Sequence, residues 1–450
     1  MSNEYFKHLF EASDKHRDMV LAAERFIWQN PETGYREWKT SAYLEKEFTK
    51  LGYTLKKAGN IPGFYTDIYT GKPGPTVLVF GELDSLICRD HPEADPETGA
   101  VHSCGHNAQC AALLGVAAAL RANGALDGLC GTIRLCAVPA EELIELGYRE
   151  ELRRQGIIKY FGGKVEFLYR GYFDDVDLAL MVHTSNLSKK FLSRKGSIGC
   201  ITKTIIYRGK AAHAGGAPQN GINALYAATL GLQAINSIRE TFIDNDHIRV
   251  HPIITKGGNA VNAIPNEVVL ESYIRGLTID AILNVNKKVN RALAGAAVCI
   301  GAKVEIIDRP GYMPLINDEN LKSIAEEAMS AVVPKNEISI VDEIGTGCTD
   351  MGDISAVMPA VHPYAAGASG QGHGNDYFIT DPELACMNSA KMQLAMLKIL
   401  LSNNAEKAKE VIAKKNPPFK SYAEYFKVLD QIFQDKDAVT YNEDETILIS

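Results

Sequence analysis

Strand patterns and a long apolar helix pattern alternate between residues 76 and 186. TVLVFGEL (76–83) is a short apolar run typical of a buried strand, and AQCAALLGVAAALRAN, which begins at Ala108, is rich in small residues that favour a helix. GTIRLCAVPAEE (131–142) and VDLALMVHTSN (176–186) are two further strand patterns. Strands that alternate with helices indicate an α/β domain, in which polar residues at the carboxyl ends of the strands form the site.

The pattern changes between residues 198 and 313. The predicted elements there run strand, helix, strand, strand, helix, strand, which is the split pattern of a ferredoxin-like domain. We therefore expect an α/β fold in which a mixed-sheet α/β catalytic domain carries an inserted ferredoxin-like α+β domain. The expected boundaries are 1–197 and 314–450 for the two parts of the catalytic domain and 198–313 for the insertion. The charged tail from residue 403 is expected to pack at the periphery.

Composition limits the class of protein and its partners. The chain has 450 residues, a net charge of -8 and a pI near 5.8. Because nucleic-acid binding needs a concentrated basic surface, we expect a small-molecule partner and no nucleic acid. No apolar run approaches the roughly 20 residues that span a bilayer, and the first residues lack the apolar core of a secretion signal. We therefore expect a cytoplasmic protein without a membrane partner.

Thiol, imidazole and carboxylate groups follow the predicted strands or lie in a glycine-rich loop. They are Cys104 and His106 in VHSCGHNAQC, Glu141 and Glu142 in PAEE, His183 in MVH, and His373 in GQGHGNDYF. These groups are good ligands for zinc and similar divalent ions, and two neighbouring ions need about this many. The set favours a two-metal hydrolase, although each side chain taken alone has an ordinary structural explanation.

Two other functions remain open from the residues alone. Cys104 is a possible covalent nucleophile activated by His106, although the intervening glycine makes direct pairing awkward and no third, orienting residue is evident. The chain is also compatible with a metal-free protein that binds a ligand in the same cleft. The two alternatives differ from the metal hydrolase in their response to chelators.

Several motifs resemble one family, in the same order along the chain. HSCGHNA, PAEE, MVH, GGNAVNAIPNEVVLESYIRG and GCTDMGDIS resemble the M20-type metallopeptidases and amidohydrolases, which include aminoacylases, hippurate hydrolases and aminobenzoyl-glutamate hydrolases. The resemblance extends from about residue 20 to residue 400. It implies cleavage of the amide or peptide bond of a small carboxylate-bearing substrate, namely an N-acyl amino acid, aminobenzoyl-glutamate or a dipeptide. It also implies a homodimer in which the inserted domain serves as lid and dimerisation domain.

The resemblance also implies roles for the candidate residues. The ligands of two divalent ions, zinc, manganese or cobalt, would be Cys104, His106, Glu142, His183 and His373. Cys104 would bridge the ions as a thiolate. His362, in AVHPYAAG, is the rival of His373 for the last position.

Four further residues would act on the substrate. Glu141 would be the general base that takes a proton from water and passes it to the leaving amine. His213, in the inserted domain, would stabilise the oxyanion. Asn262 and Arg275 would hold the substrate carboxylate, for which the planar fork of arginine is suited.

Three features around the motifs concern the surroundings of the ligands. Asp84, in GELDSL, is expected to orient a metal-binding histidine. Asn107 stands where the family most often has aspartate and is expected to remove a negative charge near the metals. The segment 87–103 is longer than the family's usual link, and its His91 and His102 are expected in a solvated loop that could shape substrate choice.

Overall fold

A computed structural model describes residues 3–443 and 446–449 of the chain, which form two compact units. Unit 1 contains the chain up to Gly196 together with Leu315–Gly345 and Thr349–Pro418. Unit 2 contains Ser197–Pro314, Thr346–Cys348 and the chain from Phe419 onward. The expected α/β class is confirmed, since unit 1 combines a mixed sheet with helices and unit 2 is the smaller α+β part.

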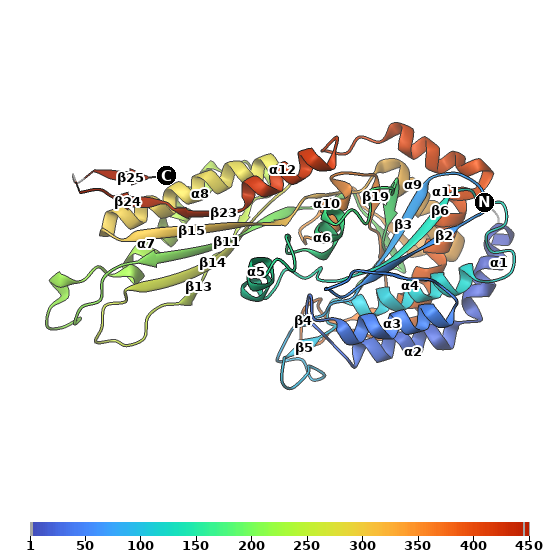
Figure 1. Cartoon of the computed structure of the whole chain (residues 1–450), viewed down its shortest axis with the longest axis horizontal. Coiled ribbons are helices and arrows are strands. Elements are labelled where there is room, and N and C mark those ends of the chain that lie inside the picture. The colour runs from blue at the N-terminus through green and yellow to red at the C-terminus, as the bar shows by residue number, and fades with distance from the viewer. Residues whose placement is uncertain (1–2, 444–445, 450) are drawn as a thin grey trace. The chain divides into compact units, whose positions relative to one another are not determined.

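Unit 1 is built on a six-stranded mixed sheet with the order β1-β2-β6-β3-β7-β19 (Figure 1). Its strands are β1 (Lys56–Lys57), β2 (Phe64–Tyr69), β3 (Thr76–Glu82), β6 (Thr132–Val138), β7 (Leu178–Leu180) and β19 (Ala360–Val361). The pairs from β1 to β6 are antiparallel, whereas β6, β3, β7 and β19 run parallel. A second sheet holds β17 (Ile338–Ile340), β9 (Phe191–Ser193), β20 (Tyr364–Ala365) and β8 (His183–Thr184). Asp84, Glu141 and His183 follow the carboxyl ends of the parallel strands β3, β6 and β7.

The apolar run of β3 is explained by cover on both of its faces. Val77 and Val79 belong to the core that includes α4, whereas Phe80 points the other way and its ring centroid lies 5.4 Å from that of Phe173. Helix α4 contacts β3 and is covered by α1 and α2, so every one of its residues is buried. This burial explains why its sequence is apolar all round instead of amphipathic.

The helices of unit 1 are α1 (Asn3–Asp14), α2 (Arg17–Trp28), α3 (Trp38–Lys50), α4 (His106–Leu120), α5 (Leu146–Arg154), α6 (Gly163–Tyr169), α9 (Glu319–Val332), α10 (Met351–Ser355) and α11 (Ser389–Lys414). A π-helical turn at Glu383–Asn388 leads directly into α11. None of the helices in the described part of the chain combines the length and the apolar character needed to cross a membrane.

Unit 2 has the expected strand, helix, strand, strand, helix, strand order of a ferredoxin-like fold. Its elements are β11 (Gly199–Arg208), α7 (Ala224–Ser237), β12 (Arg249–Val250), β13 (Ile253–Lys256), β14 (Glu267–Gly276), α8 (Ile279–Ile300) and β15 (Lys303–Tyr312). The antiparallel sheet has the order β12-β14-β11-β15-β23, and β13 also pairs with β14. Leu270 and Ile274 of β14 face α7 and α8, so Tyr273 and Arg275 point to the opposite face, which we call the open face.

The C-terminal segment forms regular elements at the edge of unit 2. Helix α12 (Tyr422–Ile432) and strands β23 (Gln434–Asp437), β24 (Val439–Tyr441) and β25 (Ile447–Ile449) follow α11. Strand β23 pairs with β15, and Ile432 and Val439 are buried in the core of unit 2. The chain from Phe419 onward therefore groups with unit 2, whereas the sequence predicts that all of 314–450 belongs to the catalytic domain. The segment is mostly charged, so the few apolar residues that anchor it to unit 2 are not recognisable from its composition.

Candidate metal centre

Two possible ligand sets in unit 1 share Cys104. One set is Cys104, His106 and His183, the other is Cys104, Glu142 and His373, and the ligand atoms of each set lie within 4.8 Å of one another. The Cys104 Sγ is 3.4 Å from the His183 Nε2, and the His373 Nε2 is 3.2 Å from the Glu142 Oε1. The structure thus brings together all five expected ligands. Sulfur, nitrogen and oxygen donors in two sets with one shared thiol fit a pair of divalent ions.

The local backbone lets a thiol and an imidazole two residues apart reach the same centre. Gly105 lies between them with a φ of 88° and caps the start of α4. A Cβ at this position would meet the hydroxyl oxygen of Tyr377 at 2.5 Å, so both conformation and space require glycine. On the other side, the backbone N–H of His373 donates to the Ser103 carbonyl at 2.8 Å, which fastens the glycine-rich loop beside Cys104.

Asp84 contacts two of the candidate ligands. The His106 Nδ1 is 2.9 Å from the backbone oxygen of Asp84 and 3.2 Å from its carboxylate. The backbone N–H of Glu142 donates to the Asp84 Oδ2 at 2.7 Å. These contacts favour a proton on Nδ1 of His106, so the buried Nε2 is the ring nitrogen that would bind a metal ion. Asp84 therefore contacts the histidine that it is expected to orient, and that role stays a prediction.

The electrostatic surroundings favour the thiolate form of Cys104. Burial and the charge of Glu142 oppose its ionisation, but His106 and His183 outweigh them and lower the pKa of Cys104 to about 6. Because the thiolate is the form of cysteine that binds metals, this environment suits a ligand at neutral pH.

Glu141 belongs to neither set with Cys104, but it lies in two other possible ligand groups, one with His106 and Glu142 and one with Glu82 and Asp350. Its Oε2 lies 3.9 Å from the His106 Nε2, so the carboxylate is beside the candidate centre. Burial raises the pKa of Glu141 well above its usual value, and the charges of Glu82 and Glu142 raise it further. A carboxyl group with a raised pKa takes up a proton readily, which is the property needed of a general base.

A buried lysine lies behind the centre and was missed by the sequence analysis. The Lys164 ammonium forms ion pairs with Glu82 and Asp350, and all three side chains are fully buried. The second oxygen of Glu82 is 3.2 Å from the His106 Nε2, so this cluster touches a candidate ligand. Glu82 stands two residues before Asp84 at the end of β3 and could have been noticed, whereas no local pattern connects Lys164 with Asp350, 186 residues away.

Arg149 fastens the segment that follows Glu142. Its buried guanidinium donates to the carbonyl oxygen of Glu142 and, at 2.6 Å, to that of Phe161. The residue lies on α5, so this helix is tied to the backbone of the candidate site. Arg149 cannot be identified from the sequence, because nothing in a charged helix indicates which arginine is buried.

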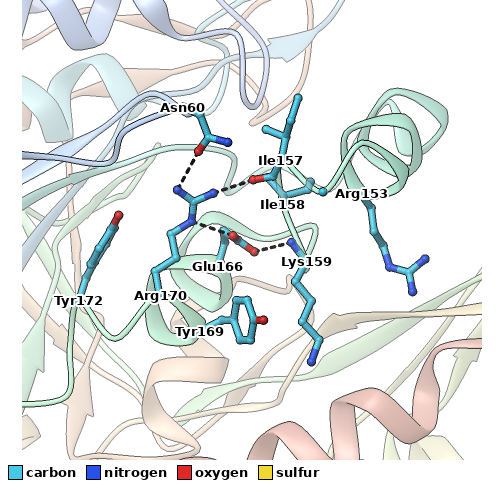
Figure 2. Close-up of a pocket in the computed structure, with 10 residues that line it drawn as sticks. Asn60, Arg153, Ile157, Ile158, Lys159, Glu166, Tyr169, Arg170 and Tyr172 are labelled. Carbon is cyan, nitrogen blue, oxygen red and sulfur yellow. Dashed lines mark hydrogen bonds and ion pairs between the residues drawn. The ribbon is translucent and has the colours of Figure 1, made fainter.

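A polar pocket of about 750 Å³ lies at the end of the same segment (Figure 2). Arg170 donates to the carboxylate of Glu166 at 2.8 Å, to the side chain of Asn60 at 3.1 Å and to the carbonyl of Ile157 at 2.7 Å. The second oxygen of Glu166 accepts from the backbone N–H of Lys159 at 2.9 Å. These groups bind one another, so the pocket is the place where residues 157–170 are held together.

Asn107 donates to a buried carboxylate of α2, a partner that the sequence does not indicate. Its amide nitrogen donates at 2.7 Å to the Oε1 of Glu24, a buried residue of α2. Burial raises the pKa of Glu24 to about 7. An aspartate at position 107 would set two buried carboxylates against each other, so the amide is explained by Glu24.

Replacing Glu24 with glutamine is expected to make stability less dependent on pH. The pKa of Glu24 is raised on folding, so its protonated form stabilises the fold at low pH, and this contribution is lost as the pH rises towards 7. Glu24→Gln should therefore exceed the wild type in stability by roughly 2 to 3 kcal/mol at pH 8 and much less at pH 5. Denaturant unfolding at both pH values measures the difference, and Glu11→Gln, at an exposed residue of α1, is the control. An equal difference in unfolding free energy between Glu24→Gln and the wild type at both pH values would contradict the raised pKa of Glu24.

Three other histidines of the region are buried in unit 1. His362 is not a member of either ligand set, although its ring centroid lies 5.7 Å from that of His183. The expected solvated loop at 87–103 is wrong for its histidines, because His91 and His102 are only 3% and 1% exposed. β5 (Ala100–Val101) pairs with β4 (Leu86–Ile87), and this hairpin folds the segment inward.

Unit 2 carries the remaining predicted residues. The Nδ1 of His213 accepts a hydrogen bond from the backbone N–H of Gly216 at 2.8 Å, so a neutral ring carries its proton on Nε2 and can donate it. The backbone oxygen of Asn262 accepts a hydrogen bond from the N–H of Ala214 at 3.0 Å, which connects the loop of Asn262 to the loop of His213. Arg275 lies near the end of β14 on the open face.

Comparisons with known proteins agree with these features. The profile of Peptidase family M20/M25/M40 matches residues 78–398. An Xaa-Arg dipeptidase of Mus musculus is 29% identical over 370 residues, which cover 79% of this chain and 78% of that protein. One of the polypeptides of the p-aminobenzoyl-glutamate hydrolase of Escherichia coli is 28% identical over 337 residues, covering 73% of this chain and 65% of that one. Among solved structures, a dinuclear metal binding peptidase of Bacillus subtilis shares the fold, with a TM-score of 0.63, 19% identity and 86% and 99% of the two chains covered.

Proposed function

This chain belongs to peptidase family M20/M25/M40, and from that membership we propose that it is a two-metal amidohydrolase. The family resemblance and the expected enzyme class, a hydrolase acting on C–N bonds, are confirmed. The proposed substrate is a small molecule with a free carboxylate, either an N-acyl amino acid, aminobenzoyl-glutamate or a dipeptide. The names of the dipeptidase and the aminobenzoyl-glutamate hydrolase support this range. The membership of Cys104 in both ligand sets is the observation that carries the two-metal proposal.

The proposed mechanism assigns proton transfer to Glu141. The five candidate ligands would hold two ions of zinc, manganese or cobalt, which when bound lower the pKa of water towards neutrality and polarise the scissile carbonyl. Glu141 accepts the proton of the attacking water and delivers it to the leaving amine. Asp84 keeps His106 in the tautomer that leaves its Nε2 available.

Residues of unit 2 are proposed to bind the substrate. The Nε2 proton of His213 is donated to the oxyanion that forms on the scissile carbonyl. Asn262 and Arg275 hold the carboxylate of the leaving half, with the guanidinium as a two-point donor. We further propose that the active protein is a homodimer, as the family resemblance implies.

Metal removal is expected to abolish hydrolysis. Purified protein should contain about two divalent ions per chain, and a chelator should stop the release of amino acid from N-acyl amino acids, aminobenzoyl-glutamate or dipeptides. Adding back zinc, manganese or cobalt should restore it, because these ions accept the same sulfur, nitrogen and oxygen donors. Elemental analysis and an amine-release assay make the two measurements.

The alternative functions give different results in the same assay. Activity that resists the chelator but is lost on alkylation would indicate that Cys104 is a covalent nucleophile. A Cys299→Ser background removes the exposed thiol, so that alkylation reports more directly on Cys104. A protein without metal or hydrolysis that still binds a carboxylate would be a binding protein.

A further inference from the structure

The open face of the unit 2 sheet contains a basic pocket of about 450 Å³. Its lining consists of Arg249, His251, Tyr273, Arg275 and Thr346. All five belong to unit 2, so the pocket is formed within one compact part of the chain. Only Arg275 has a role in the proposed function.

The strand register places the two arginines directly opposite each other. β12 and β14 are antiparallel, and Arg249 is the partner of Arg275. Residues that are opposite in an antiparallel pair share one face, with their Cβ atoms roughly 4.5 to 5.5 Å apart, and like charges there are destabilising. His251 lies two residues beyond Arg249, and Tyr273 two residues before Arg275, so both continue the same row of side chains.

The protein supplies no described ion pair to balance these two charges. Arg249 donates to the backbone oxygen of Ile248 at 3.0 Å, and the Arg275 guanidinium lies 5.4 Å from the ring centroid of Tyr273. Among the described residues, no carboxylate is within ion-pair distance of either guanidinium. The next acid along the same face of β14 is Glu271, four residues and therefore about 13 Å from Arg275. Two permanent charges, partly exposed and facing one pocket, are suited to an anionic ligand.

We propose that Arg249 and His251 form a second carboxylate subsite beside Arg275, so that the enzyme prefers substrates whose leaving half is an acidic amino acid. This inference rests on the proposed function, in which Arg275 holds the carboxylate common to all the candidate substrates. Neighbouring strands lie about 4.8 Å apart, which places the two guanidinium groups to receive two carboxylates of one small molecule. Aspartate and glutamate carry a second carboxylate on a short side chain, whereas their amides do not.

Calorimetric binding of the free amino acids to the full chain tests the subsite without relying on catalysis. L-Glutamate, the leaving half itself, is expected to bind at least about tenfold more tightly than L-glutamine. The side-chain carboxylate of glutamate forms charged hydrogen bonds with the subsite, and these are stronger than the hydrogen bonds of the neutral amide of glutamine. Arg249→Gln should remove most of this preference, because it should weaken the binding of glutamate and leave the binding of glutamine unchanged. His251→Gln should reduce the preference in the same direction, and Arg249→Lys should retain part of it because the charge remains.

Arg208→Gln is the matched control. Arg208 lies on β11 of the same sheet, but its guanidinium is already paired with Glu267 and Glu305. The preference for glutamate over glutamine should therefore survive in this variant.

The outcomes separate this inference from the proposed function. Equal or undetectable binding of both amino acids by the wild type would overturn the subsite. If Arg249→Gln weakened the binding of glutamate and glutamine equally, the subsite would also be overturned, because both arginines would then bind the one carboxylate that the two amino acids share. Hydrolysis of N-acetyl-L-glutamate and N-acetyl-L-glutamine, measured in parallel, should show the same preference. A protein that prefers glutamate but hydrolyses no amide would retain the subsite and contradict the proposed enzyme.

Discussion

Glu141→Gln is expected to lower turnover by about a thousandfold while metal content stays unchanged. Glutamine preserves the size of the side chain but cannot accept the proton that the reaction releases. Glu141 belongs to neither ligand set with Cys104, and the proposed arrangement holds both metals through the five other side chains, although Glu141 also lies in possible ligand groups with His106 and Glu142 and with Glu82 and Asp350. Steady-state hydrolysis of the best substrate, combined with elemental analysis of the same preparation, gives both quantities.

The adjacent residue provides the matched variant. Glu142 is next to Glu141 in sequence and equally buried, but its carboxylate belongs to the set with Cys104 and His373. Glu142→Gln should therefore lose metal together with activity, and added metal should restore part of the activity. Near-normal turnover of Glu141→Gln would contradict the general-base role. Loss of metal from that variant would indicate that Glu141 is a metal ligand.

Lys164→Met is expected to destabilise the protein by about 3 to 5 kcal/mol. The methionine fills a similar volume, but it leaves Glu82 and Asp350 buried without the cation that pairs with both. The cost is set by two carboxylates that burial separates from water, rather than by the lost packing of a side chain. The midpoint of denaturant unfolding measures it, and metal binding should weaken as well because Glu82 lies against His106.

Two comparisons identify the cause of that loss. Lys407→Met removes an exposed lysine that pairs with Glu410 on α11 and should change stability by less than about 1 kcal/mol. Adding Asp350→Asn to Lys164→Met should recover part of the loss, since one of the two uncompensated charges is then gone. A double variant no more stable than Lys164→Met would show that the carboxylates are not the source of the destabilisation.

The order of the elements and most of the candidate ligands could be predicted because their signals are local. A strand shows a period of two and a helix a period of 3.6 in any short window, so the ferredoxin-like order of unit 2 is visible without knowledge of contacts. Cys104 and His106 are two residues apart in one turn, and Glu141 and Glu142 directly follow a strand pattern. The roles given to these residues, and to His213, Asn262 and Arg275, stay predictions that the proposed experiments test.

The pairing of side chains that lie far apart along the chain was decided only by the tertiary structure. Asn107 meets Glu24 across 83 residues, and Lys164 meets Asp350 across 186. Likewise, strand register alone sets Arg249 opposite Arg275, and packing alone anchors the charged C-terminal segment to unit 2 through residues such as Ile432 and Val439. The sequence by itself determined which backbone segments form strands and helices and where reactive groups follow them, because those preferences act between near neighbours. Which buried charge meets which partner depends on the packing of whole elements, and no short stretch of sequence contains that information.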